Sequence, residues 1–293
     1  MATSACQALL VIMALAAAAL MSTASGTLQY DFYRSSCPKA EEAGCDASIL
    51  LDQSNSNPQP EKLAIPLRGY DAVNTIKAAV EAVCPGVVSC ADVLAYAARD
   101  SSLVSGGFTF AMPGGRRDGL ASDLNDIFGS IPGPSMQVQQ LIGSFGAKGL
   151  SADDLVALSG AHSFGITHCS FVTPRLYPAA DPTLNGTLAA ALVKACPRGG
   201  PGSTVVNNNA VTDPNVLSNQ YYKNLATGEV LFTSDQTLTS SAATAKMVQD
   251  NAANPVAWMA RFAGAMVKMG GIEVLTGTQG EVRKVCGATN SGS

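Results

Sequence analysis

The feature that most constrains the fold is the stretch of residues 151–165, which reads SADDLVALSGAHSFG. Ser151, with Asp154 three positions later, is typical of a capping box at the start of a helix. One face of that helix carries three residues spaced three and four positions apart: Leu155, Leu158 and His162. Gly165 follows the pattern and is expected to end it. The stretch therefore predicts an amphipathic helix with a histidine on its apolar face.

His162 is unusual because the chain has only two histidines, and the other, His168, does not share this apolar face. Gly160 lacks a side chain two positions before His162, so a flat or bulky group can approach the backbone there. Two interpretations of His162 remain open at this point. It is either a core histidine bonded to a backbone carbonyl, or an imidazole that an apolar wall presents to a metal or haem iron.

Helical spacing recurs along the chain, whereas alternation of apolar and polar residues is almost absent. Apolar positions in residues 69–83 step by three and four, and Ser89 is placed to cap a second helix over residues 91–100. Asn254 followed by Pro255 starts a long helix. Its expected apolar face consists of Val256, Met259, Ala263 and Met266. Further helices are expected over residues 138–145, 187–195, 218–225 and 243–251, with one short strand over 229–232. The chain is predicted to be mainly α-helical.

The N-terminus and the cysteines both indicate export. Residues 8–21 form an uninterrupted apolar run, shorter than the roughly 20 residues that span a bilayer and followed by small residues. We place a signal peptide at residues 1–26, although no Lys or Arg precedes Arg34. Cys6 lies in this segment, so seven of the eight cysteines remain in the mature chain, and one must stay unpaired or bond to another chain.

Composition and local motifs exclude several functions. A formal net charge of −4 with 14% charged residues gives no basic surface for nucleic acid. The sequence has no glycine-rich phosphate loop, no CxxC pair and no HExxH motif. Either a polar turn or oxygen ligands for a hard cation could be formed by Gly44, Asp46 and Ser48. A local ion-paired turn is expected at Arg116, Arg117 and Asp118.

Several segments stand in an order typical of one known family: FYRSSCP, GCDASILLD, CPGVVSCADVLAYAARD, GGRRDG, DLVALSGAHSFG followed by Cys169, LFTSDQTL, and a final arm at Cys286. They resemble the secreted plant haem peroxidases (class III) and cover nearly all of the mature chain. The resemblance implies that residues 27–293 form an all-α, two-domain fold with one haem b between the domains. It also implies a monomer, outside the cell, in the wall or in the vacuole, that reduces hydrogen peroxide with phenolic electron donors and engages neither nucleic acid nor membrane.

The resemblance assigns roles to individual residues. His162 becomes the proximal ligand of the haem iron, and Asp235, in LFTSDQTL, accepts the hydrogen of its other ring nitrogen. Pro132 matches a proline beside the channel for reducing substrates. The implied disulfides are Cys37–Cys84, Cys90–Cys286 and Cys169–Cys196, which leaves Cys45 unpaired. Two incomplete calcium sites are implied, a distal one at Gly44, Asp46, Ser48 and Glu61, and a proximal one at Ser163, Asp213, Val216 and Ser218.

One segment of the family has no counterpart in this chain. In the family, GCDAS directly follows a helix that ends like RxHFHDCFV and supplies the distal histidine and arginine and the cysteine that pairs with the equivalent of Cys45. Here the sequence passes straight through Glu42, Ala43 and Gly44. This internal deletion at residues 42–44 removes about 30 residues, or roughly 45 Å of continuous helix. We therefore predict that no distal catalytic residue is retained and that peroxidase activity is impaired. The alternatives are a non-catalytic haem-binding remnant and an unstable product of a truncated transcript or gene model.

Overall fold

The structure, a computed structural model, describes residues 27–37, 46–63, 67–209 and 212–291. The predicted signal peptide, the deletion at residues 42–44, Gly44 and Cys45 lie outside these ranges. The fold is mainly α-helical, as predicted, with α2 (Tyr70–Val83), α3 (Cys90–Gly106), α4 (Leu124–Ser130), α5 (Val138–Ala147), α6 (Ala152–Ser159), α7 (Cys169–Val172), α8 (Gly186–Ala195), α9 (Gln220–Thr227), α10 (Thr233–Gln236), α11 (Ala242–Ala253) and α12 (Pro255–Met269). Short 3₁₀ helices are η1 (Ser48–Leu50), η2 (Glu61–Leu63), η3 (Gly160–Ser163), η4 (Thr173–Arg175) and η5 (Thr237–Thr239).

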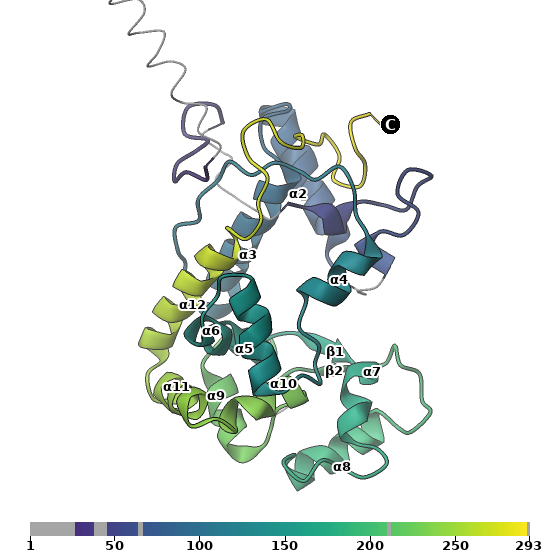
Figure 1. Cartoon of the computed structure of the whole chain (residues 1–293), viewed down its shortest axis with the longest axis vertical. Coiled ribbons are helices and arrows are strands. Elements are labelled where there is room, and N and C mark those ends of the chain that lie inside the picture. Colours follow the sequence, from purple (N-terminus) through teal and green to yellow (C-terminus); the bar gives the residue numbers. More distant parts are fainter. Residues whose placement is uncertain (1–26, 38–45, 64–66, 210–211, 292–293) are drawn as a thin grey trace, which may run out of the picture.

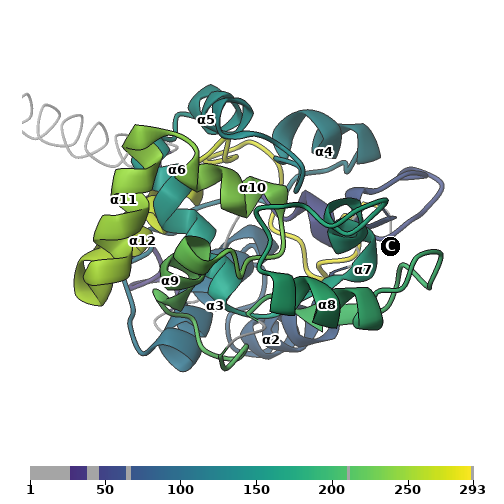
Figure 2. The same ribbon diagram turned by 90° about the horizontal axis from the view of Figure 1, so that it is seen from below.

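The helices form an upper and a lower group in Figure 1. Helices α2, α3 and α4 lie above with the C-terminal segment, and α5, α6 and α9–α12 are gathered below. The view from below in Figure 2 shows α11 and α12 beside α6 at one end and α7 and α8 at the other. Strands β1 (Ile166–His168) and β2 (Val205–Asn207) form an antiparallel pair. Within the described residues, no helix is long and apolar enough to cross a bilayer.

The core of the lower group forms where α6 packs against α5, α11 and α12. The expected apolar face of α12 is only partly correct: Met259 and Met266 pack against the core, but Val256 is 74% exposed. The buried residues of the helix are Trp258, Phe262 and Ala265. Trp258 decides the orientation: its indole Nε1 donates a hydrogen bond to the carbonyl of Ala157 on α6, at 3.2 Å. Met269, the last residue of α12, is exposed.

Most helices predicted from spacing are confirmed, but the strand expected at residues 229–232 is wrong. This segment has no regular secondary structure and bends at Leu231. Instead the guanidinium of Arg175 donates to the carbonyls of Val230, at 2.6 Å, and Phe232, at 3.3 Å. A buried cation therefore satisfies the backbone oxygens that a neighbouring strand would otherwise have bound.

The turn expected at residues 116–118 is also wrong, since its charges bind distant elements. Arg116 is buried, and its Nη1 lies 2.8 Å from Oδ1 of Asp92 on α3. The carboxylate of Asp118 accepts the backbone N–H groups of Cys90, at 3.1 Å, and Ala91, at 2.7 Å. This loop therefore fastens the start of α3 rather than closing on itself.

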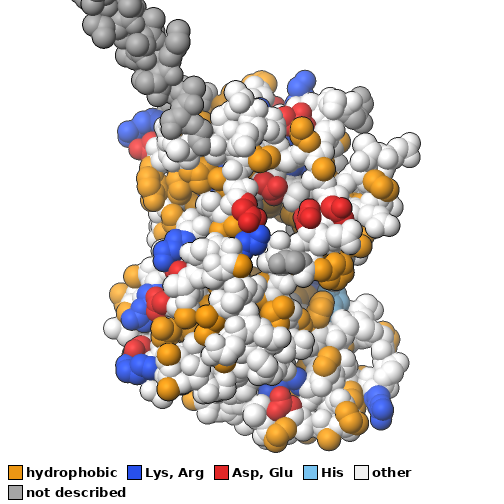
Figure 3. Space-filling model, viewed as in Figure 1, with side chains coloured by type: hydrophobic (Ala, Val, Ile, Leu, Met, Phe, Trp, Pro, Cys, Tyr) orange, Lys and Arg blue, Asp and Glu red, His pale blue; other side chains and the backbone are white. Residues whose placement is uncertain are grey.

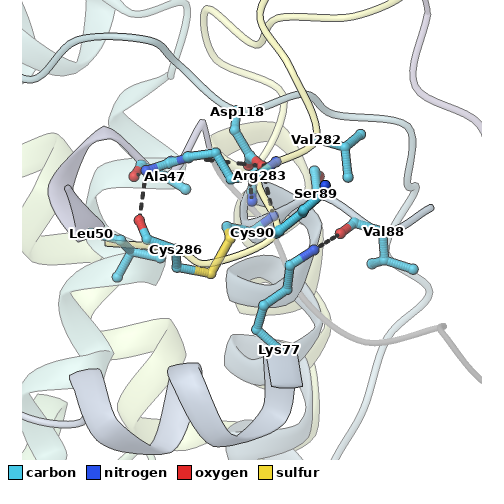
Figure 4. Close-up of a disulfide and its surroundings, with 12 residues drawn as sticks. Ala47, Leu50, Lys77, Val88, Ser89, Cys90, Asp118, Val282, Arg283 and Cys286 are labelled. Atoms are coloured by element: carbon cyan, nitrogen blue, oxygen red, sulfur yellow. Dashed lines mark hydrogen bonds and ion pairs between the residues drawn. A yellow bond between two sulfur atoms is a disulfide. The ribbon is translucent and has the colours of Figure 1, made fainter. Parts of the chain in front are cut away.

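The structure contains the three disulfides that the resemblance implied: Cys37–Cys84, Cys90–Cys286 and Cys169–Cys196. Cys90–Cys286 joins the start of α3 to the C-terminal arm, and Figure 4 shows its surroundings. Arg283 lies beside this disulfide and donates to the carbonyls of Cys286, at 2.7 Å, and Ala47, at 2.6 Å. One guanidinium thus joins the C-terminal arm to a segment near the N-terminus of the described chain.

Candidate functional site

The helix that leads to His162 begins with the predicted capping box. The N–H of Asp154 donates to Ser151 Oγ, at 3.1 Å, and the N–H of Ser151 donates to Asp154 Oδ2, at 2.9 Å. Lys268 of α12 adds an ion pair, with its Nζ 2.7 Å from Asp154 Oδ1. Burial raises the pKa of Asp154, but these hydrogen bonds lower it more, so the net pKa lies below its ordinary value. The start of α6 is therefore fixed by α12.

The predicted helix does not continue to Gly165, because α6 ends at Ser159 and the chain tightens into η3. A Cβ at Gly160 would lie 2.7 Å from both Trp258 Nε1 and Tyr222 OH. The close approach predicted at Gly160 therefore occurs, but the protein's own aromatic side chains make it. His162 consequently lies on a 3₁₀ turn and not on the α-helix.

His162 faces the carboxylate of Asp235, at the N-terminal turn of α10. Nδ1 of His162 and Oδ1 of Asp235 lie 2.7 Å apart, and Asp235 is 2% exposed. Burial lowers the pKa of His162, but the neighbouring carboxylate raises it more, so this pKa lies above its ordinary value. The interpretation of His162 as a core histidine bonded to a carbonyl is wrong.

His162 and Asp235 line a cavity of about 190 Å³. Pro132, the residue expected beside the substrate channel, lines the same cavity. Its wall is apolar, formed mainly by Leu141, Phe145, Leu155 and Leu158. The His162 side chain is 41% exposed, and its Nε2 has no hydrogen-bond partner in the described part of the chain. With Nδ1 turned to a carboxylate, the lone pair of Nε2 is available to a ligand.

The donor set fits a haem iron: His162 would hold the iron through Nε2. A histidine whose second ring nitrogen donates to a buried carboxylate is a fixed, electron-rich metal ligand. Asp235 can play this part because its Oδ2 also accepts the backbone N–H of Phe232, at 3.0 Å, which holds the carboxylate still. The ring of Phe232 meets His162 edge-on, with centroids 5.2 Å apart.

Comparison with known proteins assigns the chain to a family. Residues 8–254 match the family model described as peroxidase. The chain belongs to the peroxidase family. It is 42% identical to Peroxidase 2 of Zea mays over 320 residues (95% of this chain, 94% of the relative) and 42% identical to Peroxidase 5 of Vitis vinifera over 256 residues (85% and 78%). It is 40% identical to Cationic peroxidase SPC4 of Sorghum bicolor over 300 residues (90% and 82%). The resemblance to plant class III peroxidases is confirmed.

The residues of the implied distal calcium site in this peroxidase lie together but bind one another. Ser48 Oγ donates to Glu61 Oε2, at 2.7 Å, and to Asp46 Oδ1, at 3.2 Å. Burial is the main cause that raises the pKa of Glu61 above its ordinary value. These three side chains are the part of the predicted set that the structure describes.

The implied proximal calcium residues are engaged in local hydrogen bonds. Ser163 Oγ accepts the N–H of Ser218, at 2.9 Å, and Asp213 Oδ1 accepts the N–H of Asn215, at 2.9 Å. Val216 closes the same turn through its N–H, which donates to the Asp213 carbonyl. In the described ranges, no group of three or more His, Cys, Asp or Glu side chains could hold a metal ion. Calcium binding therefore stays a prediction for this peroxidase.

Acidic side chains gather across the middle of the face shown in Figure 3. A cavity of about 750 Å³ lies between α4, η1, η2 and the segment after α12, and its acidic lining residues are Asp46, Glu61, Asp126 and Glu273. Lys148 partly offsets this charge, with its Nζ 2.7 Å from a Glu273 carboxylate oxygen. The hollow therefore disfavours anionic molecules.

The sequence patterns did not identify two residues of the site. Phe232 packs on the His162 ring, and Tyr221 of α9 donates to Asp235 Oδ1 from 3.0 Å. The only sequence signal was the adjacent tyrosine pair, Tyr221 and Tyr222, in a segment expected to be helical. Neither the spacing nor the composition indicates that this pair reaches the histidine.

Proposed function

We propose that this chain binds haem b through His162 as a secreted member of the plant peroxidase family, and that its turnover with hydrogen peroxide and phenolic donors is impaired. The observation that carries the first part is the 2.7 Å contact between His162 and buried Asp235. It leaves Nε2 beside an apolar cavity, with no hydrogen-bond partner among the residues that the structure describes. When bound, haem supplies a redox-active iron.

The residues on the His162 side have clear roles in this proposal. Asp235 holds the proton on Nδ1, so Nε2 is the nitrogen that faces the ligand. The contact also orients the imidazole and increases its electron density, which favours the oxidised states of an iron bound to it. The apolar wall of the cavity lines one side of the ring, whose side chain is 41% exposed.

The second part of the proposal concerns the opposite side of the haem. Peroxide cleavage requires a base that moves a proton between the two oxygens and a cation that stabilises the developing charge. The described residues that line the His162 cavity include no second histidine and no arginine. His168 is held in strand β1, opposite Val205 of β2. We infer that neither catalytic function is supplied.

The alignment with the maize relative supports a deletion. It extends over 320 positions, more than the 293 residues of the whole chain, so the relative contains positions with no counterpart here. We place the main loss at residues 42–44. Calcium, if bound, would use the residues named above with fewer ligands than a complete site.

Haem reconstitution of the mature chain tests the binding proposal. We expect a Soret band with the wild type and with His168→Ala, and its loss with His162→Ala. Absence of a His162-dependent band in a folded wild-type chain would refute haem binding. A chain that does not fold would instead identify an unstable product, and coding sequence for RxHFHDC in the transcript at codons 42–44 would identify a truncated gene model.

Turnover of a phenol with hydrogen peroxide tests the impairment. Loss of acid–base and electrostatic catalysis predicts a kcat/KM about 10⁴-fold or more below that of the maize relative assayed beside it. A value within tenfold of the relative would show that the chain supplies its own distal groups. No turnover, together with His162-dependent haem binding, would identify a non-catalytic haem-binding remnant.

A further inference from the structure

The carboxylate of Asp235 is shared by two side chains on one oxygen. Oδ1 accepts the hydrogen of His162 Nδ1, at 2.7 Å, and that of the Tyr221 hydroxyl, at 3.0 Å. Oδ2 accepts the backbone N–H of Phe232, at 3.0 Å. A carboxylate oxygen has two lone pairs, so both acceptor positions of Oδ1 are used. His162 and Tyr221 therefore compete for the same negative charge.

Tyr221 is placed to act as a permanent donor. It is 1% exposed, and its ring contacts those of Tyr222, with centroids 5.1 Å apart, and His162, with centroids 6.2 Å apart. Burial first, and the charge of Asp235 second, raise the pKa of Tyr221 well above its ordinary value. The hydroxyl consequently keeps its proton and points it at Asp235.

We propose that Tyr221 is a positioning residue that limits how strongly Asp235 draws the Nδ1 proton of His162. The inference rests on the proposed haem ligation for its effect on iron, but the hydrogen bonds themselves belong to this chain. A carboxylate that accepts a second charge-assisted hydrogen bond on the same oxygen has less charge to share with the first donor. Tyr221 thereby holds His162 closer to imidazole and further from imidazolate.

The adjacent Tyr222 provides a matched control. It is also fully buried on α9, but its hydroxyl donates to the carbonyls of Val156, at 2.8 Å, and Ala157, at 3.0 Å, in α6. Tyr222→Phe and Tyr221→Phe each remove one buried hydroxyl from the same helix. Only Tyr221→Phe removes a donor from Asp235.

The first test uses the chain without haem. In protein labelled with ¹⁵N-histidine, the two histidines are distinguished with His168→Ala, and the His162 Nδ1 proton is observed at a pH where the ring is neutral. We expect Tyr221→Phe to move this resonance downfield, because the Nδ1–H···Oδ1 bond strengthens, and Tyr222→Phe to leave it in place. An unchanged resonance in folded Tyr221→Phe, or equal shifts in both variants, would overturn the proposal.

If Tyr221→Phe does not fold, a second substitution with the opposite expected shift of the Nδ1 proton resonance can be used. Incorporation of 3-fluorotyrosine at position 221 keeps the hydroxyl and makes it a stronger donor, so the resonance should move upfield. A downfield shift there would contradict the proposal.

The second test uses the haem-loaded protein and a redox titration. Tyr221→Phe should lower the equilibrium constant for reduction of the iron roughly tenfold, which is 59 mV for one electron. Tyr222→Phe should leave the potential unchanged, and a rise in Tyr221→Phe would refute the proposed direction. If wild type binds no haem, the proposed function fails, but the measurement on the haem-free chain still decides the role of Tyr221.

Discussion

At the scale of single residues, the end of α6, just before His162, is packed against side chains from other helices. The N–H of Gly160 donates to the carbonyl of Ala157, three positions back, so the backbone has left the α-helical pattern before it reaches His162. Trp258 and Tyr222 also donate to that carbonyl, at 3.2 Å and 3.0 Å. The absence of a side chain at Gly160 therefore leaves room for these two aromatic side chains at the point where α6 ends and η3 begins.

Substitution of Gly160 by alanine tests this arrangement. Its Cβ would be too close to both Trp258 and Tyr222, which are fully buried and cannot withdraw freely. We expect Gly160→Ala to reduce the free energy of unfolding by about 1–3 kcal/mol, measured by urea denaturation. Gly143→Ala on α5 is the control, because its Cβ meets nothing within 4 Å, and it should be neutral or stabilising. Equal effects of the two changes would contradict the steric explanation.

The ion pair between Asp154 and Lys268 at the start of α6 predicts that the free energy of unfolding depends on pH. Because the folded-state pKa of Asp154 is lowered, its contribution to stability is present above the ordinary carboxylate pKa of about 3.9 and is lost as the pH falls through the lowered value. Asp154→Asn should therefore reduce the free energy of unfolding by about 1 kcal/mol at pH 7. The difference from wild type should shrink below about pH 4.

The adjacent Asp153 supplies the control for this prediction. It occupies the same first turn of α6, but the described structure shows no ion pair for it. We expect Asp153→Asn to leave the pH dependence of the free energy of unfolding unchanged, measured by urea denaturation from pH 7 to pH 3. A wild-type profile that stays flat below pH 4 would show that the Lys268 contact is not formed in solution.

At the scale of secondary structure, the spacing of apolar residues was sufficient to predict a helix that buries one continuous apolar stripe. Residues 69–83 and 243–251 became α2 and α11 almost as predicted. Spacing failed for short segments whose backbone partners come from elsewhere. Strands β1 and β2 have only three residues each and are too short to show alternation, and a distant arginine binds the carbonyls of residues 230 and 232. Such partners cannot be deduced from local sequence.

The sequence predicted Ser89 as the N-cap of α3, and its contribution to the free energy of unfolding can be measured. Ser89 Oγ accepts the N–H of Asp92, at 2.9 Å, in a fully buried position. Ser89→Ala should reduce the free energy of unfolding by about 1–2 kcal/mol, since the first turn loses an acceptor that water cannot replace. Ser241 also stands at a helix start, but its side chain makes no capping bond. Ser241→Ala should consequently change stability much less, and similar losses would show that Ser89 acts by packing alone.

At the scale of the whole molecule, the candidate site combines parts that sequence motifs identify with parts that only packing reveals. The motifs pointed to His162, Asp235 and Pro132, which the fold brings to one cavity although they lie far apart in the chain. The second donor on Asp235 could not be predicted, because no motif or spacing in residues 220–236 indicates that Tyr221 faces Asp235. The distal half of the family's site was predicted to be missing from motif order alone, and its junction at residues 42–44 lies outside the described residues.

The connection between the two ends of the chain gives the last prediction. Arg283 is completely buried, donates to the carbonyls of Ala47 and Cys286, and lies 3.9 Å from Asp118. Burial raises the pKa of Asp118, and the charge of Arg283 is the largest effect that opposes this rise. Arg283→Met removes the cation, so Asp118 becomes a buried charge without its partner. We expect the free energy of unfolding to fall by about 3–5 kcal/mol, measured by urea denaturation with the disulfides intact.

A surface arginine separates this effect from the general loss of one positive charge. Arg34 is 80% exposed and lies 3.6 Å from Asp31, so Arg34→Met should leave stability nearly unchanged. Arg283→Met combined with Asp118→Asn should recover part of the loss, because the uncompensated carboxylate is then removed. No recovery in the double variant would mean that Arg283 stabilises the chain mainly through the carbonyls of Ala47 and Cys286. In that case the C-terminal arm is held by backbone hydrogen bonds and the Cys90–Cys286 disulfide rather than by charge.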